Sequence, residues 1–158
     1  MKVAVLQPKG IVFQEVSIQV NLDENENPVE TNNFDFAGVQ ISCEVGYADP
    51  DNENNVDNKA SMLVSIALTI ANQEGKKAPY NVKVAATGIF AWLDKKTPDH
   101  ERRDLTVVNG ASILYGSIRE MVLNVTSRSL SGSLLLPSFN FIDHKPSITE
   151  SQQAEKSD

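Results

Sequence analysis

The stretch "SILYGSIREMVLNVTSRSLSGSLLLPSFNF", residues 112–141, joins two different apolar patterns at a Ser-Gly break. Before the break, apolar residues recur in alternating steps of four and three, which is the spacing of one face of an α-helix. After it, Pro137 lies within the apolar run and argues against a continued helix, so 130–143 is expected to be extended. The segment holds more apolar side chains than one small sheet buries easily.

The helix is expected to span about Thr106 to Arg128. Its main apolar face consists of Val107, Ala111, Leu114, Ile118, Met121 and Val125, reinforced by Val108, Tyr115 and Val122. Leu105, Ile113 and Leu123 lie on the other side of the helix, with Gly116 among small neighbours that permit close approach. A helix that is apolar on two sides commonly has two partners. We therefore predict that Ile113, Gly116 and Leu123 form an oligomer interface, while the main face covers a sheet.

Four stretches upstream of the helix have the period-two alternation of strands. They are 2–20, interrupted by a break at Gln7-Pro8-Lys9-Gly10, then 36–48, 60–73 and 79–93. The polar stretch 21–35 is expected to be a surface crossover or loop, 48–59 a turn or long hairpin loop, and "NQEGKKAP" a hairpin. Consecutive strands joined by hairpins predict an antiparallel sheet, and the fold class is therefore α+β.

The chain has 158 residues, which is within the range of a single domain. We expect one domain over residues 1–143 and a flexible C-terminal tail over 144–158, whose composition is that of a disordered end. No apolar run reaches the roughly 18 residues that a membrane-spanning helix needs. The N-terminus has no signal-peptide core, so no membrane insertion and a cytoplasmic location are expected.

Little in the sequence supports catalysis or metal binding. The net charge of −7 disfavours nucleic acid as a partner, and Cys43 is the only cysteine, which excludes an intrachain disulfide. His100 and His144 lie in polar segments, and the acidic stretch 49–57 lacks the glycine and glutamate of a calcium loop. We therefore expect no catalytic residue, no metal and no cofactor, and an enzyme is disfavoured. Arg119 and Glu120 are interpreted as solvated or intersubunit salt-bridging residues.

Four sequence words, in this order and spacing, resemble the SecB family of bacterial export chaperones. They are "VAVLQPKGIVF" (3–13), "YNVKVAATGIF" (80–90), "NGASILYGSIREMVLNVTSR" (109–128) and "LLLPSFNF" (134–141). The resemblance implies a SecB-like subunit, with a four-stranded antiparallel sheet packed by one long C-terminal helix and followed by an extended apolar segment. It also implies a homotetramer built as a dimer of dimers. Such proteins are ATP-independent holdases that bind unfolded preproteins or nascent chains in a hydrophobic groove for protein export.

The resemblance also assigns candidate peptide-binding residues. They are Leu134, Leu135, Leu136, Phe139 and Phe141 after the helix, Phe34 and Phe36 before the second strand, and Phe90 and Trp92 on the fourth strand. Plain core or subunit packing is the alternative for each of them, and for Phe90 and Trp92 it carries at least equal weight.

Two departures from the family pattern keep other functions open. The acidic positions with which the family contacts the motor SecA correspond to Gly10, Gln14, Asn81 and Lys83, none of which is acidic. The family's second C-terminal helix is also not expected, since residues 144–158 lack an apolar period. The partner could therefore be a dedicated client, such as the antitoxin of a toxin–antitoxin module, in place of export clients. A non-chaperone oligomeric adaptor that binds one fixed partner is the third alternative.

Overall fold

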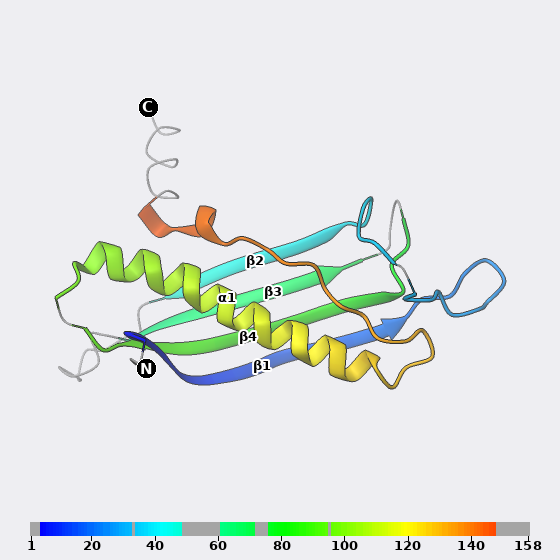
Figure 1. Cartoon of the computed structure of the whole chain (residues 1–158), viewed down its shortest axis with the longest axis horizontal. Helices are drawn as coiled ribbons and strands as arrows, with labels where there is room; N and C mark the ends of the chain where they lie inside the picture. Colours follow the sequence, from blue (N-terminus) through cyan, green and yellow to red (C-terminus); the bar gives the residue numbers. More distant parts are fainter. Residues whose placement is uncertain (1–3, 33, 49–60, 72–75, 95, 148–158) are drawn as a thin grey trace, which may run out of the picture.

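The computed structural model describes residues 4–32, 34–48, 61–71, 76–94 and 96–147. Its elements are β1 (Leu6–Val20), β2 (Ile41–Ala48), β3 (Ser61–Ile70), β4 (Tyr80–Trp92), α1 (Asp99–Thr126) and the short 3-10 helix η1 (Ile142–His144). Helix α1 crosses one face of the sheet, and the chain then runs back along the helix on the β2 side (Figure 1). The predicted α+β class, with an antiparallel sheet and one long helix, is confirmed.

The strands pair antiparallel in the order β1-β4-β3-β2. Strands β2, β3 and β4 are sequential neighbours, as hairpin connections require, whereas β1 joins the sheet beside β4. The connection 21–40 therefore leads from one edge of the sheet to the other. The predicted break at 7–10 is wrong, because β1 continues through it with a shift in register between Pro8 and Gly10. An edge strand tolerates Pro8 since one side of its backbone has no ladder to complete.

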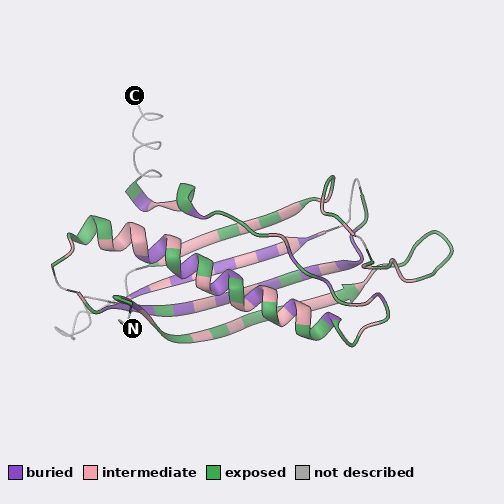
Figure 2. Ribbon diagram, in the orientation of Figure 1, coloured by how far each residue is buried: buried purple, intermediate pink, exposed green. Residues whose placement is uncertain are grey.

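The core lies between α1 and one face of the two central strands, where buried residues alternate along β3 and β4 (Figure 2). Leu68 and Val84 on the sheet and Leu114 on the helix are fully buried. Two glycines set how closely the layers approach. A Cβ at Gly88 would lie 2.7 Å from the Phe90 ring, and one at Gly110 would lie 3.0 Å from the Val64 side chain. The other face of the sheet is not covered by α1.

Helix α1 begins at Asp99, about two turns before the predicted start. Its first turns are polar, so the spacing of apolar residues could not mark them. Asp99 and Glu101 lie in the first turn, where negative charge interacts favourably with the helix dipole. At the other end, Val125 was expected on the covered face but is exposed. In these last turns Val122 and Thr126 are fully buried, so the covered face passes through these two residues and Val125 lies outside it.

The chain after α1 stays attached to the domain as far as residue 147. Pro146 is buried, and the hydroxyl and N–H of Ser147 both donate to the carboxylate of Asp104 near the start of α1. The first residues of the predicted tail, 144–147, therefore contact the domain. The rest of the predicted tail, 148–158, lies outside the described residues, as do 49–59 of the predicted loop at 48–59 and 72–75 of the predicted hairpin.

Candidate peptide-binding surface

Residues 133–141, here called the strap, are held against α1 by three helix side chains. Thr126 Oγ1 accepts the N–H of Leu134 at 2.8 Å. Arg119 Nε donates to the carbonyl of Leu136 at 3.1 Å, and the Tyr115 hydroxyl donates to the carbonyl of Pro137 at 2.5 Å. All three bonds are made with backbone atoms of the strap. The helix therefore fixes the path of the strap through its backbone and not through its side chains.

Side chains of the strap point alternately inward and outward over residues 134–136, as in an extended chain, whereas residues 138–140 are all exposed. Leu134, Leu136 and Phe141 are buried in the core. Leu135 is 61% exposed and Phe139 is 37% exposed. The five predicted peptide-binding residues of the strap therefore divide into three that stabilise the subunit and two that reach its surface.

Phe139 rests on Tyr115, with their ring centroids 5.1 Å apart, while Phe141 approaches the same ring at 5.7 Å. Tilted and edge-to-face contacts at these separations are favourable for aromatic pairs. Because Phe139 is supported on one side and open on the other, it offers an aromatic surface to another molecule without leaving its position.

The inner face of the edge strand β2 is only partly covered. Ile41, Cys43 and Val45 pack against the core but remain half-buried. Burial raises the pKa of the Cys43 thiol to about 11. It also raises the pKa of Tyr115 to about 12, with a further contribution from the nearby Cys43. Burial therefore disfavours the charged form of both groups, and they stay uncharged to a higher pH than exposed groups would.

Phe34 and Phe36 form an edge-to-face pair just before β2, with centroids 5.2 Å apart. The Lys76 ammonium lies 4.8 Å from the centre of the Phe34 ring and is bound to Asp35. The hydrogen bond from Lys76 lowers the pKa of the Asp35 carboxyl, and the N–H of Ala37 lowers it further. Phe34 is half-buried, and its ring already contacts the ammonium group of Lys76.

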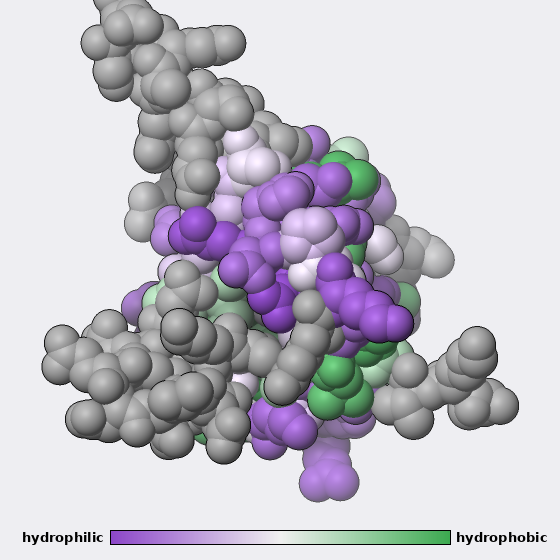
Figure 3. Space-filling model, turned by 90° about the vertical axis from the view of Figure 1, so that its left-hand side faces the viewer, coloured by the Kyte–Doolittle hydropathy of each residue, from purple (hydrophilic) through white to green (hydrophobic). Residues whose placement is uncertain are grey.

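These residues define a surface that we call the apolar strip: Phe34, Phe36, Ile41, Cys43, Val45, Leu135 and Phe139. Trp92 and Phe90 do not contribute to it, because both are buried in the core. Figure 3 shows the end of the molecule where α1 begins, and hydrophilic residues cover most of its described surface, with small separate hydrophobic areas.

The predicted oligomer residues lie on α1 away from the fully buried face. Ile113 and Leu123 are half-buried, Ile113 in part against the core, and Gly116 is exposed with no atom outside the local helix backbone within 4 Å of where a Cβ would be. Neighbouring Arg119 faces the strap, whereas Glu120 is exposed. The two residues therefore have separate environments, and Arg119 has a structural role that its sequence position did not reveal.

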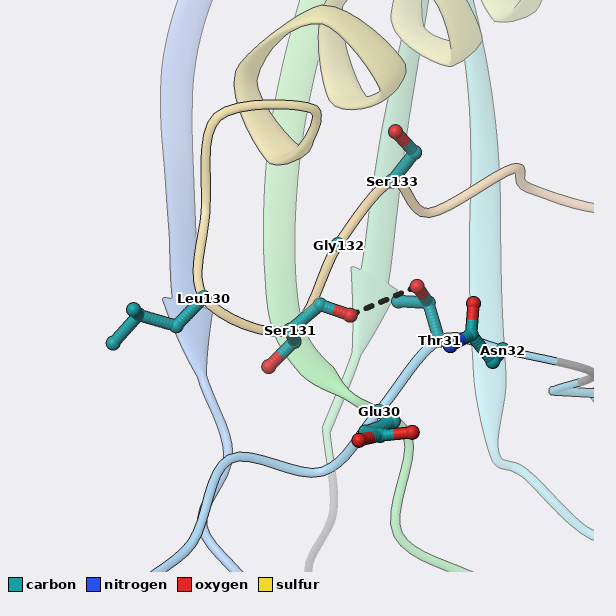
Figure 4. Close-up of a pocket in the computed structure, with 7 residues that line it drawn as sticks. All are labelled: Glu30, Thr31, Asn32, Leu130, Ser131, Gly132 and Ser133. Atoms are coloured by element: carbon teal, nitrogen blue, oxygen red, sulfur yellow. Dashed lines mark hydrogen bonds between the residues drawn. The ribbon is translucent and has the colours of Figure 1, made fainter.

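A polar cavity of about 440 Å³, which the sequence reading missed, lies where the turn after α1 meets the chain before Phe34 (Figure 4). Its lining residues are Glu30, Thr31, Asn32, Leu130, Ser131, Gly132 and Ser133. Thr31 joins its two walls, since its N–H and its hydroxyl both donate to the carbonyl of Ser131. The Ser-Gly pair at 131–132 suggested only a break in the sequence, because the partner wall lies 100 residues earlier.

Among the described residues, no group of three or more His, Cys, Asp or Glu is placed to hold a metal ion. Of the two histidines, His100 is exposed and His144 lies beside Phe141, with ring centroids 5.9 Å apart. No helix within the described ranges is long and apolar enough to cross a membrane.

Comparison with known proteins points to one fold. No family model matches the chain, and no curated protein matches it. Among solved structures, the chain is similar to the SecB-like chaperone Rv1957 of Mycobacterium tuberculosis, solved in complex with a ChAD peptide from the Rv1956 HigA1 antitoxin. The TM-score is 0.53 at 19% identity, over 85% of this chain and 91% of that one. The fold is SecB-like.

A second solved structure, a protein of unknown function from Streptococcus agalactiae, matches with a TM-score of 0.48 at 15% identity, over 84% of this chain and 97% of the other. Within the SecB-like fold of the present chain, the strap and the inner face of β2 are the elements that leave apolar side chains accessible.

Proposed function

We propose that this chain is an ATP-independent cytoplasmic chaperone that holds an unfolded or extended polypeptide segment along the apolar strip. The observation that supports the proposal is the incomplete burial of the inner face of β2. Ile41, Cys43 and Val45 are half-buried beside the exposed Leu135 and Phe139, on a SecB-like fold. A protein that holds clients must keep apolar surface accessible, and exposed apolar patches typically mark interaction sites.

The strip also suits an extended client for a reason of backbone geometry. Strand β2 is at the edge of the sheet and pairs only with β3 among the described strands. The N–H and C=O groups on its outer side can therefore bond to an added strand, whatever the client's sequence. Backbone bonds would supply affinity, while the side chains of the strip would select apolar residues at alternate positions.

A dedicated client is the form of this function that we favour. The Mycobacterium tuberculosis chaperone of similar fold was solved with a peptide from an antitoxin. On the present chain, Gly10, Gln14, Asn81 and Lys83 lie on the sheet face away from α1, and none carries a negative charge. Lys83 is instead positive and pairs with Glu15 at 3.0 Å. The four positions therefore lack the negative charge that the family uses to dock on SecA, and export through SecA is disfavoured.

Assembly into a homotetramer, a dimer of dimers, is part of the proposal. The outer side of α1 bears the half-buried Ile113 and Leu123 around the open position at Gly116. A second copy packed there would bury this side of the helix, and small residues permit the close approach of two helices. The apolar strip lies on the β2 side and would remain accessible to a client.

The test is suppression of the aggregation of an unfolded protein, without ATP, by the wild type and by a Leu135→Ala, Phe139→Ala double variant. We expect the variant to lose most of the protection, since both side chains are exposed and their loss removes client contacts. Leu22→Ala is the matched control, because Leu22 is also exposed and its loop lies beyond the end of the sheet (Figure 1).

Equal protection by the double variant and the wild type, with the fold retained, would show that clients do not bind at the strip. If the wild type protects no unfolded protein yet binds one partner tightly, the chain acts as a dedicated chaperone or an adaptor. Refolding of a stoichiometric antitoxin client in its presence then separates these two functions.

A further inference from the structure

We propose that the sheet face turned away from α1, here called the outer face, packs against the outer face of a second copy of this chain. Two assemblies of the chain would then join sheet to sheet. This contact is separate from the apolar strip and from the interface on α1, and it goes beyond the proposed function. The exposure of the face, its lack of charge and the order of large and small side chains on it support the inference.

The outer face is apolar at the end where β4 finishes. Val12 is 65% exposed and Ile89 is 46% exposed, and Leu63, which pairs with Ile89 in register, is half-buried. Val5 and Leu93 lie at the same end, where the N–H of Leu93 donates to the carbonyl of Val5, and both side chains are exposed. Apolar side chains grouped on an exposed face typically mark an interaction site.

The other described residues on this half of the outer face are uncharged, apart from Lys9 in the bulge of the edge strand β1. They are Gln7, Gly10, Gly46, Ala48, Ser61, Ser65, Thr87 and Ala91. The charged side chains Glu15, Glu44 and Lys83 lie farther along the strands, where Glu15 and Lys83 form an ion pair at 3.0 Å. Depletion of charge is characteristic of the centre of a protein interface, because uncharged groups lose their water at low cost.

Two adjacent rows of residues across the four strands contain large and small side chains in opposite order. In the order β1-β4-β3-β2, one row is Gly10, Ile89, Leu63 and Ala48, and the next is Val12, Thr87, Ser65 and Gly46. A two-fold axis that runs between these rows, across the strands, lays each row over the other row of the second copy. Ile89 then faces the smaller Thr87 of the other copy. At each position a larger side chain meets a smaller one, which permits the close packing of two sheets.

Gly10 provides an open position for a side chain of the second copy. A Cβ on this glycine would have no atom beyond its chain neighbours within 4 Å, so the space above it is not filled by its own subunit. The same axis places the exposed Val12 of one copy over Gly10 of the other. The pair occurs twice in the interface because the axis is two-fold, and each Val12 is removed from water.

The arrangement also keeps like charges apart. The row with Gln7 and Ala91 would lie over the row with Glu15 and Ala85, so the Glu15 carboxylate meets an amide and not a second carboxylate. From a strand spacing of about 4.8 Å and a rise of about 3.4 Å per residue, the four facing rows cover on the order of 500 Å² of each copy. A standard interface covers about 800 Å² per partner. We therefore expect a weak contact that forms at high protein concentration.

The test is sedimentation equilibrium of the full chain from micromolar to near-millimolar concentration. We expect the mass to rise at least about twofold above that of the smallest assembly, since every assembly carries free outer faces. Ile89→Lys and Gly10→Leu should each abolish the rise, because one places a charge in the contact and the other fills the open position. Gln19→Lys, exposed on the same face at the other end of β1, is the matched control and should retain it. Circular dichroism checks that each variant is folded.

Two further measurements distinguish this contact from others. Gly116→Arg should leave the rise with concentration in place, because α1 and the outer face lie on opposite sides of the sheet (Figure 1). Sodium sulfate should strengthen the association, as it does for apolar contacts, whereas an ionic contact would weaken.

A mass that does not change with concentration overturns the proposal and leaves the outer face to a partner of another kind. So does a rise that persists in both Ile89→Lys and Gly10→Leu, that disappears in Gly116→Arg, or that weakens in sulfate. Loss of the rise in only one of the two outer-face variants overturns the arrangement about this axis.

Discussion

The hydroxyl of Tyr115 donates to the carbonyl oxygen of Pro137 across 2.5 Å, and this bond joins the buried face of α1 to the strap. Tyr115 is itself buried and supports the ring of Phe139 from below. One side chain therefore fixes both the path of the strap and the position of the exposed aromatic residue on it. The surface proposed to bind clients is set by the core beneath it and does not depend on a mobile loop.

Removal of this hydroxyl should weaken the strap more than the rest of the domain. We expect Tyr115→Phe to lower the free energy of unfolding by about 1–2 kcal/mol, because the Pro137 carbonyl loses its partner in a partly buried position. Urea unfolding gives the stability, and hydrogen exchange should show faster exchange at the Leu134 and Leu136 amides. Tyr47→Phe, on β2, is the control and should change both quantities little. Unchanged exchange in the strap would contradict the role given to this bond.

The pKa of the Cys43 thiol should show how far β2 is buried from solvent. Burial raises this pKa from 9.0 to about 11, which favours the neutral thiol in the folded state. Its contribution to stability is therefore complete below pH 9 and is lost as pH rises from 9 to 11. Alkylation by iodoacetamide, which requires the thiolate, should follow an apparent pKa near 11 in the native chain and near 9 in urea. The same pKa in both states would show that β2 is solvated.

The period of the apolar pattern was sufficient to predict the sheet and most of α1. Strand β3 alternates along its whole length between buried and half-buried residues, and its predicted range differs from the observed one by only a few residues. The early start of α1 was missed, because the first turns, which include Arg102 and Arg103, are polar and have no apolar period. The Arg103 guanidinium lies 5.3 Å from the centre of the Tyr47 ring, a pair that no local pattern could indicate.

The candidate site was less predictable for a specific reason. The run Leu134-Leu135-Leu136 gives no contrast between its members, so the sequence could not distinguish the two buried residues from the exposed one. Which of the three leucines are buried depends on where Thr126 and Arg119 bind the backbone of the strap. The polar cavity was missed because its walls, Thr31 and Ser131, are distant in the chain and ordinary in composition.

Two glycines should respond in opposite directions to the same substitution. Gly132→Ala places a Cβ 2.8 Å from Thr31 Oγ1 at a φ of +82°, and we expect a loss of about 1–3 kcal/mol in unfolding free energy. Gly116→Ala meets no neighbour within the subunit and should stabilise the isolated subunit by about 1 kcal/mol, the helix-propensity difference between the two residues. Thermal and urea unfolding check both values. A tolerated Gly132→Ala would mean that the turn is not fixed as described.

A large charged side chain on the outer side of α1 should disrupt assembly without unfolding the subunit. We expect Gly116→Arg to reduce the native mass measured by light scattering from that of a tetramer to that of a smaller species, because the arginine fills the space needed for close helix approach. Circular dichroism should remain unchanged. Glu24→Arg, in an exposed loop, is the control and should leave the mass unaltered. A wild-type chain that is a strict monomer would contradict the proposed assembly directly.

Alanine substitutions of the two phenylalanines of the strap should affect stability and client binding differently. Phe141 is 3% exposed within the core, so Phe141→Ala is expected to cost about 3–5 kcal/mol of unfolding free energy through the lost burial and the cavity left behind. Phe139 rests on Tyr115 with its other side in solvent, and Phe139→Ala should cost much less while weakening client protection. Protection must therefore be compared at temperatures where both variants are folded, as judged by circular dichroism. If Phe139→Ala destabilises as much as Phe141→Ala, its ring belongs to the core and client binding has to be sought on Leu135 and β2.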